Sequence, residues 1–293
     1  MAKTTIWTGA TDGDFTVAGN WSNGVPVTGD TVIFRDSAVD LDTTLDQSAI
    51  TLASLVIEQS YTGLLGLSTQ AADYLQIGAT LVSIGEHYGY GSPAGSGRLK
   101  LDLSAANTAV TVHNTASSSQ DENLPPLRLL TAGTVTLNIT KGVVGVACES
   151  AAETSAITAL NVAYDSSQSS DVDLVCGEGC TVTTVVKRGG NAVLRKNATT
   201  ITNYAGDLVL AGTDTVTTLT VWGGTVTPNG AMTITTLAPN GGIVDFLTSS
   251  AARTVTNAVA LAPGSTLRYD PGKVTFSGGL TASVPVSISA AAA

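Results

Sequence analysis

A short Thr-rich motif recurs along the second half of this 293-residue chain and limits the folds that the chain can adopt. The motif is Thr-(Val/Ile)-Thr-(Thr/Asn), and successive copies begin 19, 15, 18 and 21 residues apart. Its β-branched residues favour extended strands over helices. A Gly-containing turn and a second short apolar run follow each copy, so two or three strands fit in one repeat. The copies are Thr181–Thr184, Thr200–Asn203, Thr215–Thr218, Thr233–Thr236 and Thr254–Asn257.

Alternation within the motif places Val or Ile on one side of each strand and Thr on the other. Antiparallel hairpins show the same alternation. A repeat of about 18 to 20 residues with similar turns is instead typical of a solenoid, in which each coil stacks on the previous one. We therefore predict an all-β fold, a parallel β-helix or solenoid. We expect it to be right-handed, because β-crossover connections strongly prefer that hand.

The organisation that we expect is one β-helix behind an N-terminal cap. The cap or docking segment covers residues 1–50, the β-helix covers residues 51–289, and residues 290–293 form a frayed tail. In the segment 151–164 the apolar spacing is compatible with one short helix. Longer loops are expected near residues 86–97, 114–126 and 149–170.

The charge balance argues against nucleic acid as a partner. Thirteen Lys and Arg residues face 23 Asp and Glu residues, which gives a net charge of −10. A surface that follows phosphates needs clustered cations, and the longest Lys/Arg runs here are two residues long. No window approaches the roughly 20 apolar residues that span a bilayer, and no apolar stretch follows Lys3, so we expect neither a membrane segment nor a secretory signal.

The cysteines and other ligand-type residues do not indicate a metal site or a cofactor. Cys176 and Cys180 have no second cysteine pair near them, and His87 and His113 lie more than sixty residues away along the chain. With Cys148 the number of cysteines is odd, which argues against a disulfide framework. Oxygen ligands for Ca²⁺ occur near the N-terminus without the spacing of an EF-hand loop. These are Asp12, Asp14, Asn20 and Asp30.

Aromatic residues concentrate near the N-terminus, where two of the three Trp and two of the four Phe lie within residues 6–34. Large apolar groups ahead of a regular repeat are typical of a cap that covers the first coil. The same aromatics could instead anchor a partner, and both interpretations stay open here. The candidate capping or docking residues are Trp7, Phe15, Trp21, Pro26 and Phe34.

The residues 7–34 follow the pattern W-x-G, then G-D-F, then N-W-S-x-G-x-P-x-x-G-D-x-V-x-F. This pattern, about a tenth of the chain, resembles the opening of two groups of β-helical proteins: autotransporter-type secreted passengers and virion proteins of tailed phages. The Ala, Thr, Gly and Val-rich composition, the low cysteine content and the missing signal are similar to the phage group. The resemblance implies a capsid-decorating, head-fibre or spike component, often trimeric.

Catalytic candidates are few. Polysaccharide cleavage would need two carboxylates about 5 to 9.5 Å apart on one face. Asp171 and Asp173 precede Glu178 on an expected strand, and Glu149 and Glu153 lie in an expected loop, but acidic residues at such turns commonly accept backbone N–H groups. We therefore expect no enzymatic activity.

Two tyrosines in a Gly-rich loop, Tyr88 and Tyr90, could stack on sugars, or they could shield a neighbouring coil. The loop lacks the G-K-[ST] ending of a phosphate cradle.

The function that we expect is therefore structural: a non-enzymatic decoration, cement or head-fibre protein of a phage capsid surface, localised to the virion and assembled in the host cytoplasm. Its expected partners are the major capsid protein or other virion subunits, and further copies of the chain in a trimer. One alternative is a tail-spike-like protein that binds a receptor or depolymerises polysaccharide. The other is a secreted β-helical adhesin passenger.

Overall fold

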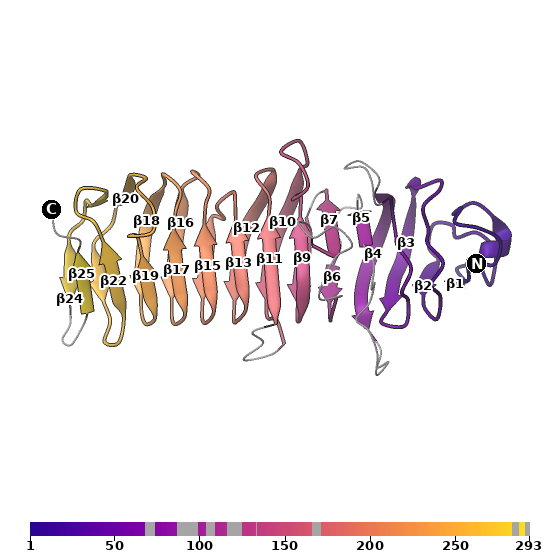
Figure 1. The fold of residues 1–293 in the computed structure, drawn as a ribbon, viewed down its shortest axis with the longest axis horizontal. Helices are drawn as coiled ribbons and strands as arrows, with labels where there is room; N and C mark the ends of the chain where they lie inside the picture. Colours follow the sequence, from indigo (N-terminus) through magenta and orange to yellow (C-terminus); the bar gives the residue numbers. More distant parts are fainter. Residues whose placement is uncertain are drawn as a thin grey trace. The chain divides into compact units, whose positions relative to one another are not determined.

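The structure is a computed structural model that describes residues 1–67, 74–86, 99–103, 109–115, 125–132, 134–165 and 171–282, with the backbone of residues 287–290. The chain divides into two compact units, Met1–Ile157 (unit 1) and Thr158–Ala293 (unit 2). Within the described residues the helical structure is limited to one 3₁₀ turn, η1 (Ala18–Asn20). Both units are otherwise built from strands (Figure 1).

Unit 1 contains two ladders of parallel strands. Its strands are β1 (Thr4–Trp7), β2 (Thr31–Phe34), β3 (Asp46–Glu58), β4 (Leu75–Glu86), β5 (Leu99–Leu103), β6 (Ala109–Val112), β7 (Leu127–Thr131), β8 (Thr136–Ile139) and β9 (Gly142–Val146). The first ladder runs through β1, β2, β3, β4, β6 and β8. The second runs from the start of β4 through β5 and β7 to β9.

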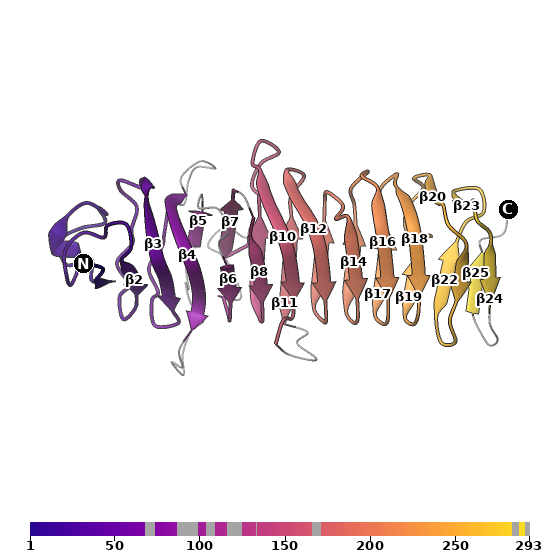
Figure 2. The same ribbon diagram turned by 180° about the vertical axis from the view of Figure 1, so that it is seen from behind.

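Unit 2 repeats this arrangement more regularly. Its strands are β11 (Val172–Cys176), β12 (Cys180–Lys187), β13 (Asn191–Leu194), β14 (Thr200–Asn203), β15 (Asp207–Leu210), β16 (Val216–Val221), β17 (Thr225–Pro228), β18 (Thr233–Pro239), β19 (Ile243–Asp245), β20 (Arg253–Val255), β21 (Val259–Leu261), β22 (Thr266–Tyr269), β23 (Val274–Phe276), β24 (Leu280–Ala282) and β25 (Ser287–Ala290). One ladder joins β11, β13, β15, β17, β19, β22 and β25 (Figure 1). The other joins β12, β14, β16, β18, β20 and β23, and Figure 2 shows its central strands from behind. A separate parallel pair is formed by β21 and β24.

The strand order confirms the predicted fold class, an all-β parallel β-helix. From β4 to β9 in unit 1 and from β11 to β20 in unit 2, strands that follow one another along the chain alternate between two ladders, so each coil adds one strand to each ladder. Equivalent residues then stack from coil to coil: Leu208 pairs with Val226, Val226 aligns with Val244, and Val244 with Leu267. All four are buried. Small aliphatic side chains suffice for this core because the coils lie in close, repeated register.

The Thr-rich motif does not stack in one register throughout. The copies that begin at Thr215, Thr233 and Thr254 align with one another, since Val216 pairs with Ile234 and Ile234 with Val255. The copy at 200–203 lies three positions further along, because Ile201 pairs with Leu219. In β16 and β18 a Thr–apolar stretch lies on either side of a break in the alternation, so a four-residue motif can align with either stretch.

The prediction of a short helix within residues 151–164 is wrong. Residues Ser155–Val162 form strand β10. Ser155 and Ile157 are buried two positions apart, and so are Leu160 and Val162. The break between these two alternating stretches sets Ile157 and Leu160 three residues apart, which imitates the spacing of a helix.

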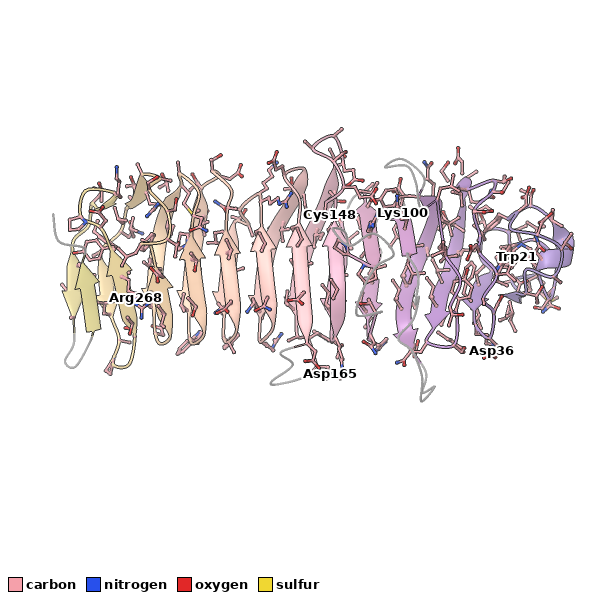
Figure 3. All side chains as sticks on the ribbon, viewed as in Figure 1. Trp21, Asp36, Lys100, Cys148, Asp165 and Arg268 are labelled. Carbon is pink, nitrogen blue, oxygen red and sulfur yellow. The ribbon has the colours of Figure 1, made fainter. Side chains whose placement is uncertain are left out.

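An aromatic cluster fills the N-terminal segment of unit 1. The ring of Trp21 lies 5.0 Å from that of Trp7 and 5.0 Å from that of Phe15, both edge to face, and 5.9 Å from that of Phe34. Its indole N–H donates to the carbonyl oxygen of Phe15 at 2.7 Å. Figure 3 labels Trp21 within this segment. Strand β1 pairs in parallel with β2, and β2 with β3, so the segment continues the first ladder of unit 1.

Parts of the expected loops and of the expected tail lie outside the described residues, namely 87–97, 116–124, 166–170 and 291–293. The third expected loop segment, 149–170, contains β10. Ala290, expected in the tail, belongs to β25.

Candidate functional site

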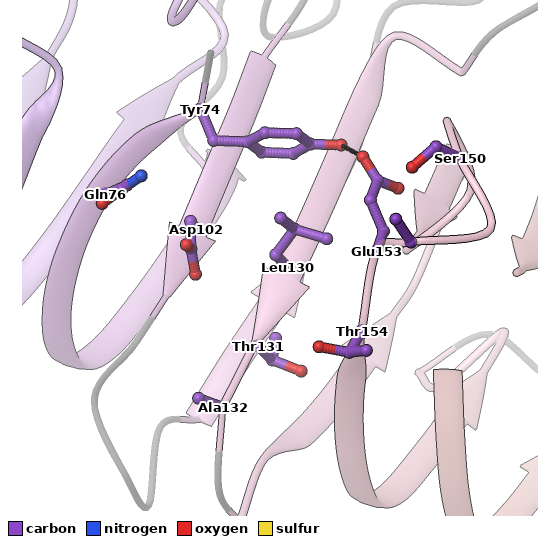
Figure 4. A pocket seen from close by; sticks show the side chains of 10 residues that line it. Tyr74, Gln76, Asp102, Leu130, Thr131, Ala132, Ser150, Glu153 and Thr154 are labelled. Carbon is purple, nitrogen blue, oxygen red and sulfur yellow. Dashed lines mark hydrogen bonds between the residues drawn. The ribbon is translucent and has the colours of Figure 1, made fainter. Parts of the chain in front are cut away.

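A pocket of about 500 Å³ opens on unit 1, where a chain segment folds back over the strands of the second ladder. The segment that covers it, residues 148–154, follows β9, and the strands beneath it are β4, β5 and β7. Figure 4 shows the pocket from close by. The lining residues are Tyr74, Gln76, Asp102, Leu130, Thr131, Ala132, Ser150, Ala152, Glu153 and Thr154.

The floor of the pocket is a row of side chains at one register position of the ladder. Asp102 pairs with Gln76 on β4 and with Leu130 on β7. Their chain neighbours Leu101 and Leu129 are fully buried in the core. Because side chains alternate across a strand, the row points outward into the pocket, with neighbouring strands about 4.8 Å apart.

Two cations lie two positions before this row, on the same side of the strands, and are excluded from solvent. Lys100 and Arg128 pair with each other on β5 and β7, and each is 1% exposed. The Nζ atom of Lys100 lies 3.0 Å from Oε1 of Glu149, and Arg128 forms a second ion pair with the same carboxylate. The Glu149 side chain is 3% exposed. Glu149 thus neutralises charge under the covering segment and ties that segment to the sheet. In Figure 3, Lys100 and Cys148 mark the ladder and the start of the segment.

The backbone conformation allows the covering segment to lie close against the second ladder. Ala147 has a φ of 46°, so the chain turns sharply at the end of β9. The next position of the cation row is Gly145, which pairs with Arg128. A Cβ atom at Gly145 would clash with the side chains of Cys148 and Pro125. Gly at this position therefore makes room for the segment over the ladder.

Glu153 on the covering segment is held at both carboxylate oxygens. Its Oε1 accepts a hydrogen bond from the Tyr74 hydroxyl at 2.9 Å, drawn as a dashed line in Figure 4, and its Oε2 accepts one from the Glu149 amide at 2.9 Å. Burial raises the pKa of Glu153, and the Tyr74 hydrogen bond opposes this shift. Burial, followed by the Glu153 charge, raises the pKa of Tyr74, whose ring also lies 5.4 Å from the ammonium of Lys100.

Asp102 differs from the other carboxylates of the site. Burial raises its pKa. Unlike Glu149 and Glu153, it makes no hydrogen bond or ion pair within the described part of the chain, and it lines the pocket. A partly desolvated acceptor without a protein partner is available to a ligand.

The carboxylates expected on and after β11 belong to unit 2 and are not part of this pocket. Asp173 is exposed, and its Oδ1 accepts a hydrogen bond from Nδ2 of Asn191 at 2.8 Å. Glu178 is exposed in a turn, and Asp171 precedes β11. None of the three lines the pocket of unit 1.

Glu149 and Glu153 do belong to the site, although the sequence placed them only in a loop. The sequence reasoning missed Asp102, Lys100 and Arg128. The sequence did contain a pattern that could have indicated the two cations. Lys100 and Arg128 each occupy the middle of a Leu-x-Leu run, at Leu99–Leu101 and Leu127–Leu129.

The capping or docking candidates Trp7, Phe15, Trp21, Pro26 and Phe34 are all buried. Direct contact with a partner would therefore involve exposed neighbours such as Val27, which is 55% exposed. The glycan candidates Tyr88 and Tyr90 lie outside the described residues.

The oxygen-rich N-terminal residues are engaged in turns. The Asn20 side-chain oxygen accepts from the amides of Thr11 and Asp12 at 2.8 and 3.1 Å, and Asn20 Nδ2 donates to Asp12 Oδ1 at 2.7 Å. Asp30 accepts from the amides of Lys3 and Val27, both at 2.9 Å.

The cysteines Cys148, Cys176 and Cys180 are free thiols. Over the ranges that the structure covers, no three His, Cys, Asp or Glu side chains are grouped to hold a metal ion. The same ranges contain no helix that could cross a bilayer. Comparisons of the chain with models of known protein families, with curated proteins and with solved structures gave no match.

Proposed function

We propose that the chain is a non-enzymatic structural protein of a virion surface, of the capsid-decoration, cement or head-fibre type of tailed phages. The observation that carries this proposal is the N-terminal motif of residues 7–34, which resembles the opening of β-helical phage proteins. In the structure the aromatic residues of this motif pack together at the first strands of a parallel β-helix. The proposed setting is the virion, assembled in the host cytoplasm.

The outer faces of unit 2 support a scaffolding role. Thr200 pairs with Thr218 and Thr218 with Thr236, while Thr202 pairs with Thr220. These rows of Thr hydroxyl groups are uncharged, so like surfaces of two copies would not repel each other when they pack side by side. We therefore propose a homotrimer, with the major capsid protein or another virion subunit as the second partner.

The depolymerase alternative receives no support from its expected residues, because Asp173 and Glu178 are exposed and Asp173 is engaged with Asn191. The adhesin alternative predicts a longer native gene with a signal and a downstream barrel. Sequencing of the gene's surroundings tests that prediction directly.

Purified particles test the structural proposal. We expect mass spectrometry to find the chain in the particles and electron cryomicroscopy to place it in the outer layer. Particles that lack the chain, or that hold it only inside the shell, would refute the proposal.

Add-back to particles that lack the chain tests docking through the N-terminal segment. Val27→Asp places a charge on an exposed apolar residue of that segment, and we expect it to lower occupancy on the shell. Leu247→Asp makes the same change at a residue of unit 2 that is 42% exposed, and occupancy should persist. Equal occupancy for both variants would exclude docking through Val27.

A further inference from the structure

The pocket of unit 1 has the volume of a small-molecule site. Its volume of about 500 Å³ falls within the range of about 300 to 1,000 Å³ that is usual for ligand pockets. It is not an accidental gap between coils, because the wall formed by residues 148–154 is fixed by two buried ion pairs and by the Tyr74 hydrogen bond.

The free polar groups of the pocket lie next to each other. Asp102 and Gln76 occupy paired positions on neighbouring strands, as Figure 4 shows. Neither side chain has a hydrogen-bond partner among the described residues, whereas Glu153 is engaged at both oxygens. A carboxylate and an amide on strands about 4.8 Å apart can accept from and donate to two adjacent groups of one ligand.

The remaining lining favours a ligand that is both apolar and polar. Leu130 and Ala132 offer apolar surface, while the hydroxyls of Ser150 and Thr154 both donate and accept hydrogen bonds. A sugar ring combines C–H faces with adjacent hydroxyl groups and matches this lining.

Charge argues against an anionic ligand such as a phosphate. The cations nearest the pocket, Lys100 and Arg128, are already paired with Glu149. The carboxyl groups that line the pocket are those of Asp102 and Glu153, and they would repel an anion.

We propose that this pocket binds a neutral saccharide, with adjacent sugar hydroxyls hydrogen-bonded to Asp102 and Gln76 and the ring against Leu130. The site binds without cleaving, because glycoside hydrolysis needs two reactive carboxylates and both oxygens of Glu153 are occupied by Tyr74 and Glu149. The proposal does not depend on the virion assignment, since the pocket is intact in the chain itself.

An array of immobilised neutral oligosaccharides of hexoses and N-acetylhexosamines tests the proposal, followed by titration calorimetry with the best oligosaccharide. We expect the wild-type chain to bind and Asp102→Asn to weaken binding at least tenfold. Asp214→Asn makes the same charge change in an exposed loop of unit 2 and should change the affinity less than twofold. Gln76→Leu, a second variant of the pocket, should also weaken binding, and circular dichroism verifies the fold of each variant.

Three results would overturn the proposal: no binding of any array saccharide, equal affinity of the wild-type and Asp102→Asn chains, or shortening of the bound oligosaccharide during incubation. Binding of spermidine that depends on Asp102, with no saccharide bound, would show a site for cations instead. Absence of the chain from virions would leave a positive saccharide result unchanged.

Discussion

The ammonium of Lys100 and the carboxylate of Glu149 lie 3.0 Å apart, and both side chains are almost completely excluded from solvent. Glu149 also pairs with Arg128, so one carboxylate contacts two buried cations on neighbouring strands. This contact holds residues 148–154 over the ladder and so creates the pocket.

Glu149→Gln should therefore be strongly destabilising. Removing one partner of a buried ion pair leaves uncompensated charge, which costs about 3–5 kcal/mol. Urea unfolding of the variant measures the loss. The control is Arg35→Gln, which breaks an exposed pair with Glu58 at 3.8 Å in the same unit and should cost less than about 1 kcal/mol. Similar losses for the two variants would contradict the central role of Glu149.

Trp21→Ala should destabilise the N-terminal segment of unit 1. The ring packs against three aromatic neighbours, and truncation of such a core residue costs about 3–5 kcal/mol. Trp222→Ala removes the same side chain at a site that is 53% exposed, and we expect a change within about 0.5 kcal/mol. Thermal unfolding of both variants provides the comparison. Equal melting temperatures of the two variants would show that the aromatic cluster contributes little to stability.

Gly224→Ala should cost more than Gly264→Ala. Both residues have a positive φ, 68° and 83°, and in that region a non-Gly residue costs about 1–2 kcal/mol. Gly264 has open space around the new methyl group, so this backbone cost is the whole expected effect. At Gly224 the methyl group would also clash with the carbonyl oxygen of Gly206 on the neighbouring coil. Chemical denaturation measures the difference, and equal losses would show that the coils separate freely at this turn.

Stability of the wild-type chain should rise between pH 8 and about 10 through Lys187. Burial lowers the pKa of Lys187 to about 8, with Asp207 opposing the shift, and its Nζ donates to the carbonyl oxygen of Ala205 at 2.6 Å. In this pH window the unfolded chain keeps the Lys187 proton and the folded chain releases it, so the free energy of unfolding increases with pH.

Denaturant titrations at pH 7.5, 8.5 and 9.5 measure this increase. Lys187→Met should remove the contribution, whereas Lys273→Met, at an exposed lysine of the same unit, should retain it. A rise that survives in Lys187→Met would assign the effect to another group.

The sequence predicted the fold well where its pattern was local and repeated. Alternation of Thr with Val or Ile identified the strands, and the recurrence of the motif identified the parallel β-helix. It failed at Ser155–Val162, where a break in the alternation imitated a helix, and it left open the register at 200–203, where the motif stacks out of phase with the later copies. In both places the conformation or the register depends on which neighbouring strand supplies the pairing partner. The residues of a single strand do not specify that partner.

The candidate site was only partly visible for the same reason. Glu149 and Glu153 were noticed as acidic residues of a loop, but Lys100, Asp102 and Arg128 were not connected with them. One coil separates Lys100 from Arg128, and the sequence does not show which residues of successive coils pair with each other.

By itself, then, the sequence determined the class of fold, because the side-chain period of a strand and the repeat of a coil are written directly in residue order. The tertiary structure alone decided the pocket, because its walls come from residues far apart in the chain. Whether Lys100 and Arg128 are solvated or buried depends on Glu149 folding back over them. The free energy of that ion-pair cluster arises only after the coils have stacked.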